Sequence, residues 1–380
     1  MFLLISDKCE KFTAAAPRLR NWLLAGIEIH GSVGLIDTVR LKPKIMIFKS
    51  DSDIKCYFAK LEAGETLGVR NLRYFSYIRY LKNFFDYGIV KAVFSILWLV
   101  NYRRYLSLSK KNIVVATSPS FHNILIGAFW KYIYDYDTVL ADMRDEWARH
   151  PNLNKNWGHK VWEKFFLSKV DKVVTVSSFI KHRIDVNRIL TFVVYNNSVD
   201  LTSFENRQPE TSIQIGTIEP KIRYFGGLHP EHYNYNLLRD LITSNPDVIF
   251  EFFSNSVGKG HPMSCLLKEK NVRMNQMISR SASLKLQAQD DNINLFLCHK
   301  GKFNQGVVST KLTEYIFSEK PILILDNCPH SDVATIIERF CTEEQTTSVT
   351  FDSDHVTLIK KRNGVSNPGY SDFRDFLLQD

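Results

Sequence analysis

The chain has 380 residues, of which 44% are apolar and 23% are charged. This composition excludes a disordered protein, and the length favours two domains over one. The net charge is +9, from 49 basic and 40 acidic residues, which favours an anionic partner: a nucleic acid, an anionic membrane surface or a phosphorylated ligand.

The cysteines and the apolar stretches indicate the cellular compartment of the protein. None of the six cysteines forms a C-x-x-C pair or clusters with histidine, which argues against a zinc site and against a disulfide framework. The opening MFLLISD is too short for a signal peptide, and the longest apolar stretch, residues 93–100, is too short to cross a bilayer. We therefore expect a cytosolic protein with reduced cysteines and no membrane span.

Short runs rich in Val, Ile and Phe alternate with helical patterns in the first half of the chain. Expected strands cover residues 2–5, 113–117, 138–143, 172–177 and 192–195. Expected helices cover residues 17–25, 121–134 and 160–168. A further short strand, IMIFKS, precedes Asp51-Ser52-Asp53. These two acids have the spacing of a metal-binding D-x-D motif, but their setting indicates a turn.

The same alternation restarts after the polar stretch 205–214. Expected strands cover residues 222–225, 248–253, 293–298 and 321–325. Expected helices cover residues 236–243, 283–289, 311–318 and 332–340. This pattern predicts an α/β fold in which helices cover both faces of parallel sheets. We expect two Rossmann-like domains facing across a cleft, over residues 1–205 and 206–350, and a tail over 351–380 that packs back on the first domain.

The segment 309–325, STKLTEYIFSEKPILIL, carries the most specific pattern in the chain. Ser309 and Thr310 are suited to cap a helix that begins near Lys311. The free amides and the positive end of that helix favour an anionic diphosphate. Glu314, one turn further on, is placed to accept hydrogen bonds from two sugar hydroxyls. The alternative is an ordinary capped helix with an exposed glutamate.

Together with other segments, this pattern resembles the retaining GT-B glycosyltransferases that use nucleotide sugars, of the group 1 type found in bacterial polysaccharide and lipopolysaccharide synthesis. The other matching segments are APRLRNWLLAGIEIHG at the start, ATSPS and LADMRDEW within 116–147, DKVVTVSSFIKHRI and VVYNNSVDLTSF within 171–204, and IRYFGGL at 222–228. The first is similar to the family's first helix leading into a Gly-x-Glu-Val strand. The resemblance implies the GT-B fold, sugar transfer with retention, and no metal or other cofactor.

The resemblance places a nucleotide-sugar donor on the second domain. It implies that Glu314 binds the ribose hydroxyls, although the second glutamate that is usual eight residues earlier is replaced by Gly306. Gly226 and Gly227 allow the backbone to approach a phosphate closely. The expected donor-binding residues are Glu314, Lys311, Thr310, Ser309, Gly227, Arg280 and Lys300.

The family's usual basic residues after the Gly loop are missing, because the loop continues HPEHYNYN with no Arg or Lys before Arg239. His229, Arg280, Lys300 and Lys311 are candidate replacements for holding the diphosphate. The sequence does not choose among them, and each is also open to interpretation as a solvated surface residue.

Charged residues gather where the strand at 138–143 ends. Burial of such groups without partners is costly, so their presence there needs a reason. By the resemblance, this strand ends near the acceptor and the transferred sugar, which makes the expected catalytic residues Asp142, Arg144, Asp145 and His122. The alternative is an internal ion pair between Arg144 and a carboxylate that only fixes the loop.

Residues 70–111 carry nine basic side chains and one acidic side chain, interleaved with aromatic residues. The resulting charge of +8 and the aromatic rings suit the headgroup region of an anionic membrane. A plain helical surface and a nucleic-acid site are the alternatives. No nucleic-acid-binding motif occurs elsewhere in the chain, so we expect a membrane surface or an acidic acceptor and no nucleic acid.

The sequence thus predicts a hexosyltransferase-type glycosyltransferase, cytoplasmic and peripheral on the inner face of the cytoplasmic membrane. It would move a sugar to a saccharide or lipid-linked acceptor in bacterial surface polysaccharide or glycolipid synthesis. Two alternatives remain open. One is a nucleotide-sugar epimerase with the same fold, and the other is a degenerate, non-catalytic partner protein.

Overall fold

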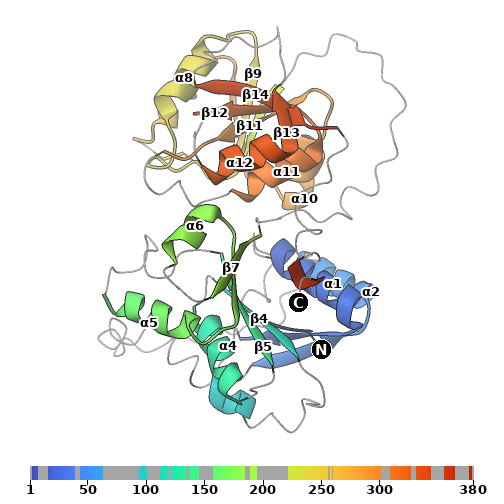
Figure 1. Cartoon of the computed structure of the whole chain (residues 1–380). Coiled ribbons are helices and arrows are strands. Elements are labelled where there is room, and N and C mark those ends of the chain that lie inside the picture. Colours follow the sequence, from blue (N-terminus) through green and yellow to red (C-terminus); the bar gives the residue numbers. More distant parts are fainter. Residues whose placement is uncertain are drawn as a thin grey trace. The chain divides into compact units, whose positions relative to one another are not determined.

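The fold was obtained as a computed structural model. The structure describes residues 2–6, 16–38, 43–62, 93, 95–100, 112–118, 121–133, 137–144, 157–184, 189–194, 221–255, 257–258, 260–300, 309–326, 331–343, 355–363 and 376–378. The chain divides into two compact units, one of residues 1–196 with 369–380 and one of residues 197–368. Each unit is built on one seven-stranded sheet (Figure 1).

The sheet of the first unit has the order β3-β2-β1-β4-β5-β6-β7. Its strands are β1 (Phe2–Ser6), β2 (Val33–Asp37), β3 (Lys44–Phe48), β4 (Ile113–Thr117), β5 (Thr138–Met143), β6 (Lys172–Thr175) and β7 (Leu190–Val193). All neighbours are parallel except β2 and β3. The strand order reverses between β1 and β4, as at the switch point of a Rossmann-like sheet.

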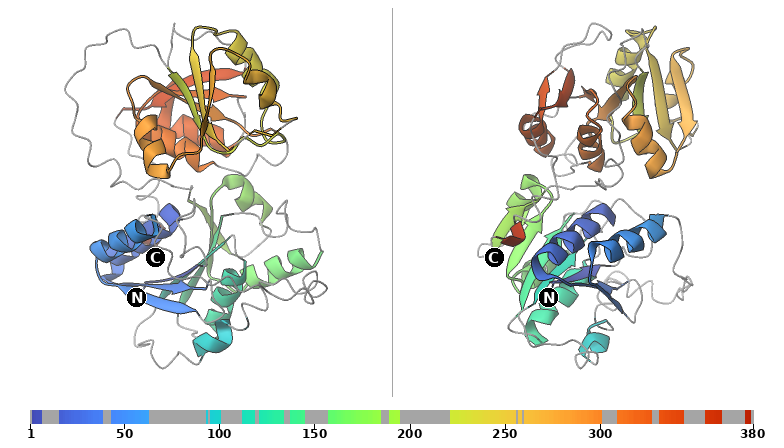
Figure 2. Two further views of the ribbon diagram at one scale, coloured as in Figure 1. Left: turned by 180° about the vertical axis from the view of Figure 1, so that it is seen from behind. Right: turned by 90° about the vertical axis from the view of Figure 1, so that its right-hand side faces the viewer.

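Helices cover both faces of this first sheet. They are α1 (Ala16–His30), α2 (Asp51–Glu62), α4 (His122–Ile133), α5 (Trp157–Leu167) and α6 (Ser178–Arg183). Alternate residues of β1 enter different cores: Leu3 and Ile5 pack with α4, whereas Phe2 and Leu4 pack with α1. Burial on both faces explains why these strands read as continuous apolar runs. The α1 and α2 helices lie side by side (Figure 2).

The acidic pair that the sequence placed in a turn lies instead at the start of α2. Asp51 is the first residue of the helix, and the Asp53 carboxylate accepts hydrogen bonds from the backbone N–H groups of Lys49 and Ser50, at 3.0 and 3.1 Å. The Ser50 hydroxyl accepts in return from the Asp53 backbone N–H at 3.2 Å. Ser50 and Asp53 thus form a capping box at the start of the helix.

The sheet of the second unit has the order β10-β9-β8-β11-β12-β14-β13. Its strands are β8 (Lys221–Phe225), β9 (Ile249–Ser254), β10 (Val272–Gln276), β11 (Asn292–Leu297), β12 (Ile322–Leu325), β13 (Cys341–Glu343) and β14 (Val356–Lys361). Its helices are α8 (Tyr235–Thr243), α9 (Met263–Leu266), α10 (Arg280–Gln287), α11 (Thr310–Ser318) and α12 (Asp332–Phe340). The first five strands are parallel, and β14 and β13 pair antiparallel.

The structure divides the expected tail, residues 351–380, between the two units. Residues 356–361 form β14 and pair with β12 in the second sheet. Phe376 and Leu377 are buried in the core that contains α1. The Phe376 ring meets Trp22 edge-on, with ring centroids 6.0 Å apart. The chain thus returns to the first unit only after it has completed the second sheet.

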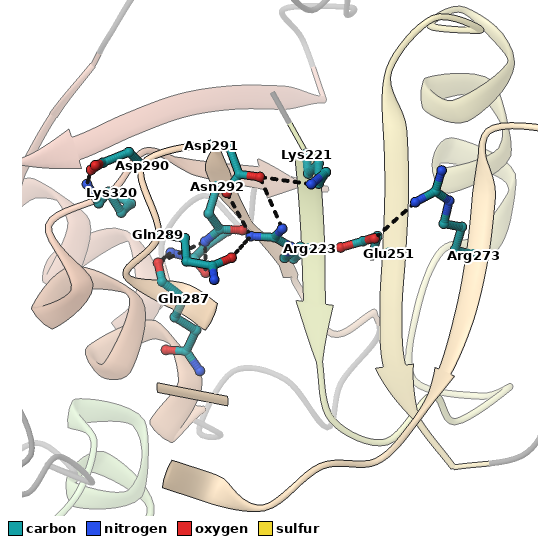
Figure 3. A network of polar contacts seen from close by, with 11 residues as sticks. Lys221, Arg223, Glu251, Arg273, Gln287, Gln289, Asp290, Asp291, Asn292 and Lys320 are labelled. Carbon is teal, nitrogen blue, oxygen red and sulfur yellow. Dashed lines mark hydrogen bonds and ion pairs between the residues drawn. The ribbon is translucent and has the colours of Figure 1, made fainter. Parts of the chain in front are cut away.

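A buried arginine links β8 to β9 and to the residue that precedes β11. Arg223, in β8, donates from Nε to the Glu251 carboxylate at 2.8 Å and from Nη1 to Asp291 at 3.1 Å (Figure 3). Its side chain is only 4% exposed. Lys221 and Arg273 add further cations at 3.0 Å from Asp291 and 3.6 Å from Glu251. This network neutralises carboxylates that would otherwise be costly to bury.

The basic aromatic segment 70–111 is described only at residue 93 and at residues 95–100, which are helical. Leu99 is buried against the core that contains α4, whereas the Leu97 side chain is 57% exposed. Among the described residues, no helix combines the length and the apolar character that a membrane crossing requires. Membrane contact through this segment stays a prediction.

Candidate functional site

The switch point of the second sheet lies between β8 and β11, which pair in parallel. The chain leaves β8 through Gly226 and Gly227, and it leaves β11 through His299 and Lys300. A hydrogen bond from the Lys300 backbone N–H to the His232 carbonyl, at 2.8 Å, joins the two loops. Ligands of such sheets bind outside the carboxyl ends of the strands at this point.

Gly226 makes room for the ammonium group of Lys311. The glycine has φ 132°, a backbone conformation that residues other than glycine rarely adopt. A Cβ atom at this position would lie 2.3 Å from Lys311 Nζ. The sequence assigned the two glycines to close approach by a phosphate. The structure shows that Gly226 instead admits a cation to the end of β8.

Lys311 is the most distinctive group of the site. Its Nζ donates to the Tyr224 hydroxyl at 2.8 Å and lies 4.5 Å from the centroid of the Tyr224 ring. Burial lowers the pKa of Lys311 to about 8, although the nearby Glu314 carboxylate opposes the shift. Among the residues that the structure describes, no carboxylate bonds the Lys311 ammonium, and a partly buried charge without such a partner is costly in a folded protein. An anionic ligand at this point would offset that cost.

The start of α11 has the structure that the sequence predicted. Ser309 is the N-cap, and its hydroxyl lies 3.4 Å from the backbone nitrogen of Lys311. Thr310 opens the helix, and its carbonyl accepts a hydrogen bond from the Thr313 hydroxyl at 2.7 Å. The Lys311 side chain therefore leaves the first turn of a helix, where the positive end of the helix dipole also favours an anion.

Two more of the predicted donor residues meet each other. Arg280 Nη2 lies 3.0 Å from Glu314 Oε1, and the two side chains are 19% and 13% exposed. Lys300 is exposed and follows β11. Burial raises the pKa of Asp326 at that strand end, and the positive charges of His355 and Lys300 oppose the rise. The structure therefore pairs Arg280 with Glu314, while Lys300 sits near Asp326.

A cluster of aromatic side chains that the sequence did not predict surrounds Lys311. The Tyr224 hydroxyl lies 2.9 Å from the Gly227 carbonyl and 3.1 Å from the Tyr233 hydroxyl. The His299 ring lies 5.0 Å from Tyr233 and 5.2 Å from His232, centroid to centroid. Burial, with the charges of His232, Lys311 and His229, lowers the pKa of His299 to about 4. The His299 ring is therefore neutral at pH 7.

Within the described part of the chain, no three His, Cys, Asp or Glu side chains are placed to hold a metal ion. The signal for this cluster in the sequence was the run HPEHYNYN, whose aromatic residues follow the Gly loop directly.

In the first unit, Asp142 is fully buried at the end of β5. Arg18 Nε donates to both of its carboxylate oxygens, at 3.0 and 3.2 Å, and Trp22 Nε1 donates at 3.2 Å. Arg18 Nη1 also donates to the Val194 carbonyl at 3.0 Å. These contacts link α1 to the ends of β5 and β7. They favour a structural role for Asp142 over the catalytic role that the sequence suggested.

Two of the remaining first-domain candidates, His122 and Arg144, lie near the switch point of β1 and β4. The His122 side chain is largely buried at the start of α4, with Nε2 3.4 Å from the Thr38 hydroxyl. The Arg144 backbone N–H donates to the Ser118 hydroxyl at 2.7 Å. Asp145 lies outside the described residues. A buried ion pair lies at this strand end between Arg18 and Asp142, whereas the alternative in which Arg144 pairs with a carboxylate stays a prediction.

Comparisons with known proteins establish the fold. No protein-family model matches the chain, and no curated protein matches it in sequence. Anabaena HepE, solved with UDP, is 13% identical over 100% of this chain and 95% of its own, with a TM-score of 0.53. A putative UDP-N-acetylglucosamine 2-epimerase from Listeria monocytogenes is 9% identical over 100% and 87%, with a TM-score of 0.51.

Sucrose-phosphate synthase from Thermosynechococcus elongatus is 12% identical over 84% of this chain and 80% of its own, with a TM-score of 0.50. Identities at this level establish the fold and not the activity. The chain therefore has the GT-B fold of two Rossmann-like domains, as the sequence predicted. The fold is shared by transferases and epimerases, so the reaction has to be argued from the site.

Proposed function

We propose that the protein is a glycosyltransferase that binds the diphosphate of a nucleotide sugar at the carboxyl ends of β8 and β11. The observation that carries this proposal is the partly buried ammonium of Lys311, placed beside Gly226 at the start of α11. Of the four basic residues that the sequence left open, Lys311 best fits the role of holding the diphosphate. A leaving diphosphate is stabilised by such a fixed cation and by helix-end amides.

The donor's ribose is assigned to Glu314. Its carboxylate lies on α11 three residues beyond Lys311, so the two side chains share one helix face. A carboxylate three residues beyond the phosphate-binding cation, on the same helix face, suits a nucleoside diphosphate, whose ribose lies next to its phosphates. The HepE structure contains UDP, which makes uridine nucleotides the first probes for this chain. No metal ion or other cofactor enters the proposed reaction.

The acceptor is proposed to be a saccharide or a lipid-linked saccharide bound to the first domain, in bacterial surface polysaccharide or glycolipid synthesis. Transfer with retention, of the hexosyltransferase type, rests on the motif resemblance. An anionic membrane surface is proposed to meet the segment 70–111, on the strength of its charge of +8. These parts of the proposal would place the protein at the inner face of the cytoplasmic membrane.

An epimerase is the second candidate, because one of the structural neighbours is a putative nucleotide-sugar epimerase. The two reactions differ in what they need. A transferase releases the nucleoside diphosphate only when an acceptor takes the sugar, whereas an epimerase turns over the nucleotide sugar alone. A degenerate, non-catalytic partner protein is the third candidate, and it would bind no donor productively.

The deciding experiment is an incubation of the purified protein with UDP-glucose, UDP-galactose and UDP-N-acetylglucosamine, followed by NMR and chromatography. We expect UDP release that depends on an added extract of lipid-linked saccharides, and no new sugar epimer. An epimer formed without the extract would replace the transferase by the epimerase. Binding without either product would favour the non-catalytic partner.

The lowered pKa of Lys311 predicts a pH-dependent affinity for UDP. In the free protein this group loses its proton as the pH rises through about 8, and only the ammonium form attracts a diphosphate. Binding should therefore take up protons near pH 8, and the affinity should fall by up to about tenfold per pH unit above it. Calorimetry at pH 7, 8 and 9, in buffers of different ionisation enthalpy, measures the proton uptake and the affinity for UDP. An affinity that does not change with pH across this range would contradict the assignment.

A further inference from the structure

A partly buried ion pair joins α10 to α11 beside the proposed donor site. Arg280 Nη2 lies 3.0 Å from Glu314 Oε1, and neither side chain is more than one-fifth exposed. The two helices contact each other and lie next to one another in Figure 1. Arg280 is the first residue of α10, directly after the N-cap Ser279. Glu314 lies in the second turn of α11.

The position of Arg280 is unfavourable for its own helix. The N-terminus of a helix carries the positive end of the dipole, where a cation is disfavoured. The first turn of α10 contains no acidic residue to compensate. The Glu314 carboxylate, across the contact between the helices, places a negative charge beside the guanidinium. The ion pair therefore joins the first turn of α10 to the second turn of α11.

An arginine fixes the orientation of a carboxylate in a way that a lysine does not. The guanidinium is a rigid, planar fork, whereas an ammonium is a compact point charge. An ionised carboxylate has about four acceptor directions on its two oxygens. A partner that engages the Oε1 side leaves further directions for ligand hydroxyls. The Lys311 ammonium on the same helix adds positive charge near this carboxylate.

We propose that Arg280 is a positioning residue that holds the Glu314 carboxylate so that it accepts hydrogen bonds from both hydroxyls of a ribose. The consequence is a site that selects ribonucleotides over 2′-deoxyribonucleotides. This inference rests on the proposed donor site. Arg280 acts through Glu314 and does not itself contact the nucleotide. Loss of one hydroxyl leaves a buried acceptor direction of the oriented carboxylate unsatisfied, which is the source of the discrimination.

The test measures a ratio of affinities. Calorimetry gives the Kd of UDP, ADP and GDP and of their 2′-deoxy counterparts for the wild type and for Glu314→Gln, Arg280→Lys and Arg280→Met. We expect the wild type to prefer a ribonucleotide by about tenfold or more. All three variants should reduce the preference to about threefold or less, and Arg280→Lys should do so although it keeps the charge.

The control is Lys285→Met, on the same helix, where the lysine is exposed in the last turn. This variant should keep the wild-type preference. An unchanged preference in Arg280→Lys and Arg280→Met would overturn the inference and leave the donor site standing. Equal weakening of the ribo and deoxy forms would also overturn it, because a merely structural role acts on both alike. Absence of binding by any nucleotide to the wild type would overturn the proposed function itself.

Discussion

Replacement of Lys311 with Met is expected to weaken the binding of UDP by about 100-fold, which corresponds to about 2.7 kcal/mol. Truncation of one partner of a buried, hydrogen-bonded charge pair commonly costs 2–5 kcal/mol or more. Met retains most of the length of the side chain, so the packing beside Gly226 and Tyr224 is largely kept. The loss therefore reports the missing positive charge at the diphosphate.

The same substitution should leave the unliganded protein at least as stable as the wild type. The pKa of Lys311 is about 8 in the folded protein against 10.5 for the ordinary group, because burial disfavours the charged form. The unfolded chain then binds more protons than the folded one between these two values, so wild-type stability rises with pH across this window. The Met variant lacks that rise. A variant that gains stability and loses its ligand is typical of a functional site.

Calorimetry with UDP and chemical denaturation at pH 7 and pH 10 check both parts. The matched control is Lys300→Met, an exposed lysine at the same end of the sheet, which should change the UDP affinity by less than about threefold. A large loss of affinity in Lys300→Met with none in Lys311→Met would transfer the diphosphate contact to Lys300.

Replacement of Arg223 with Met is expected to destabilise the second unit by about 3 kcal/mol. The substitution removes the cation that bonds both Glu251 and Asp291 and leaves two largely buried carboxylates. Breaking a buried pair commonly costs 3–5 kcal/mol, and the low end applies because Arg273 and Lys221 remain nearby. For a unit of this size, the melting temperature should fall by about 6–12 °C.

Arg273→Met is the matched control for this prediction, since Arg273 contacts the same Glu251 at 3.6 Å but is 57% exposed. It should cost less than about 1 kcal/mol. Burial tends to raise the pKa of Asp291, but hydrogen bonds from Lys221 and Arg223 outweigh it and lower the pKa overall. Because its pKa is lowered on folding, the Asp291 carboxylate stabilises the folded protein at pH values above 3.8, the ordinary pKa. This contribution is lost as the pH falls below 3.8 and through the lowered pKa. Equal melting temperatures for both variants would contradict the role of this network.

The strands and helices with strong apolar periodicity were predictable from the sequence. The expected strands at 113–117 and 138–143 match β4 and β5, and the expected helix at 332–340 matches α12. Other elements were missed because their patterns are weak. The edge strand β10 contains only exposed and half-buried residues, and β14 follows a polar stretch that resembled a tail. Pairing across the sheet, and not local sequence, fixes such strands.

One misplaced boundary shows the limit of the motif comparison. The sequence suggested that Gly-Ile-Glu-Ile, residues 26–29, begins a second strand, but α1 continues to His30 and the strand starts at Val33. A Cβ on Gly26 would lie 2.6 Å from the Phe2 ring. The glycine therefore allows α1 to pack closely on β1. Close packing of the helix, and not the end of the helix, accounts for a glycine at this position.

The candidate site was predictable in part. Spacing on one helix placed Ser309, Lys311 and Glu314 together, and the structure agrees. The partners from other elements were not predictable, because Tyr224 and Arg280 reach α11 only through the tertiary fold. The same holds in the first unit, where the carboxylate of Asp142 pairs with Arg18, 124 residues away in the chain.

A crystal structure of the wild-type protein grown with UDP tests the central claim most directly. The account predicts diphosphate oxygens within hydrogen-bonding distance of Lys311 Nζ and of the backbone amides at the start of α11, with the ribose hydroxyls on Glu314. UDP bound elsewhere in the second unit, with Lys311 still bonded to Tyr224, would contradict the account.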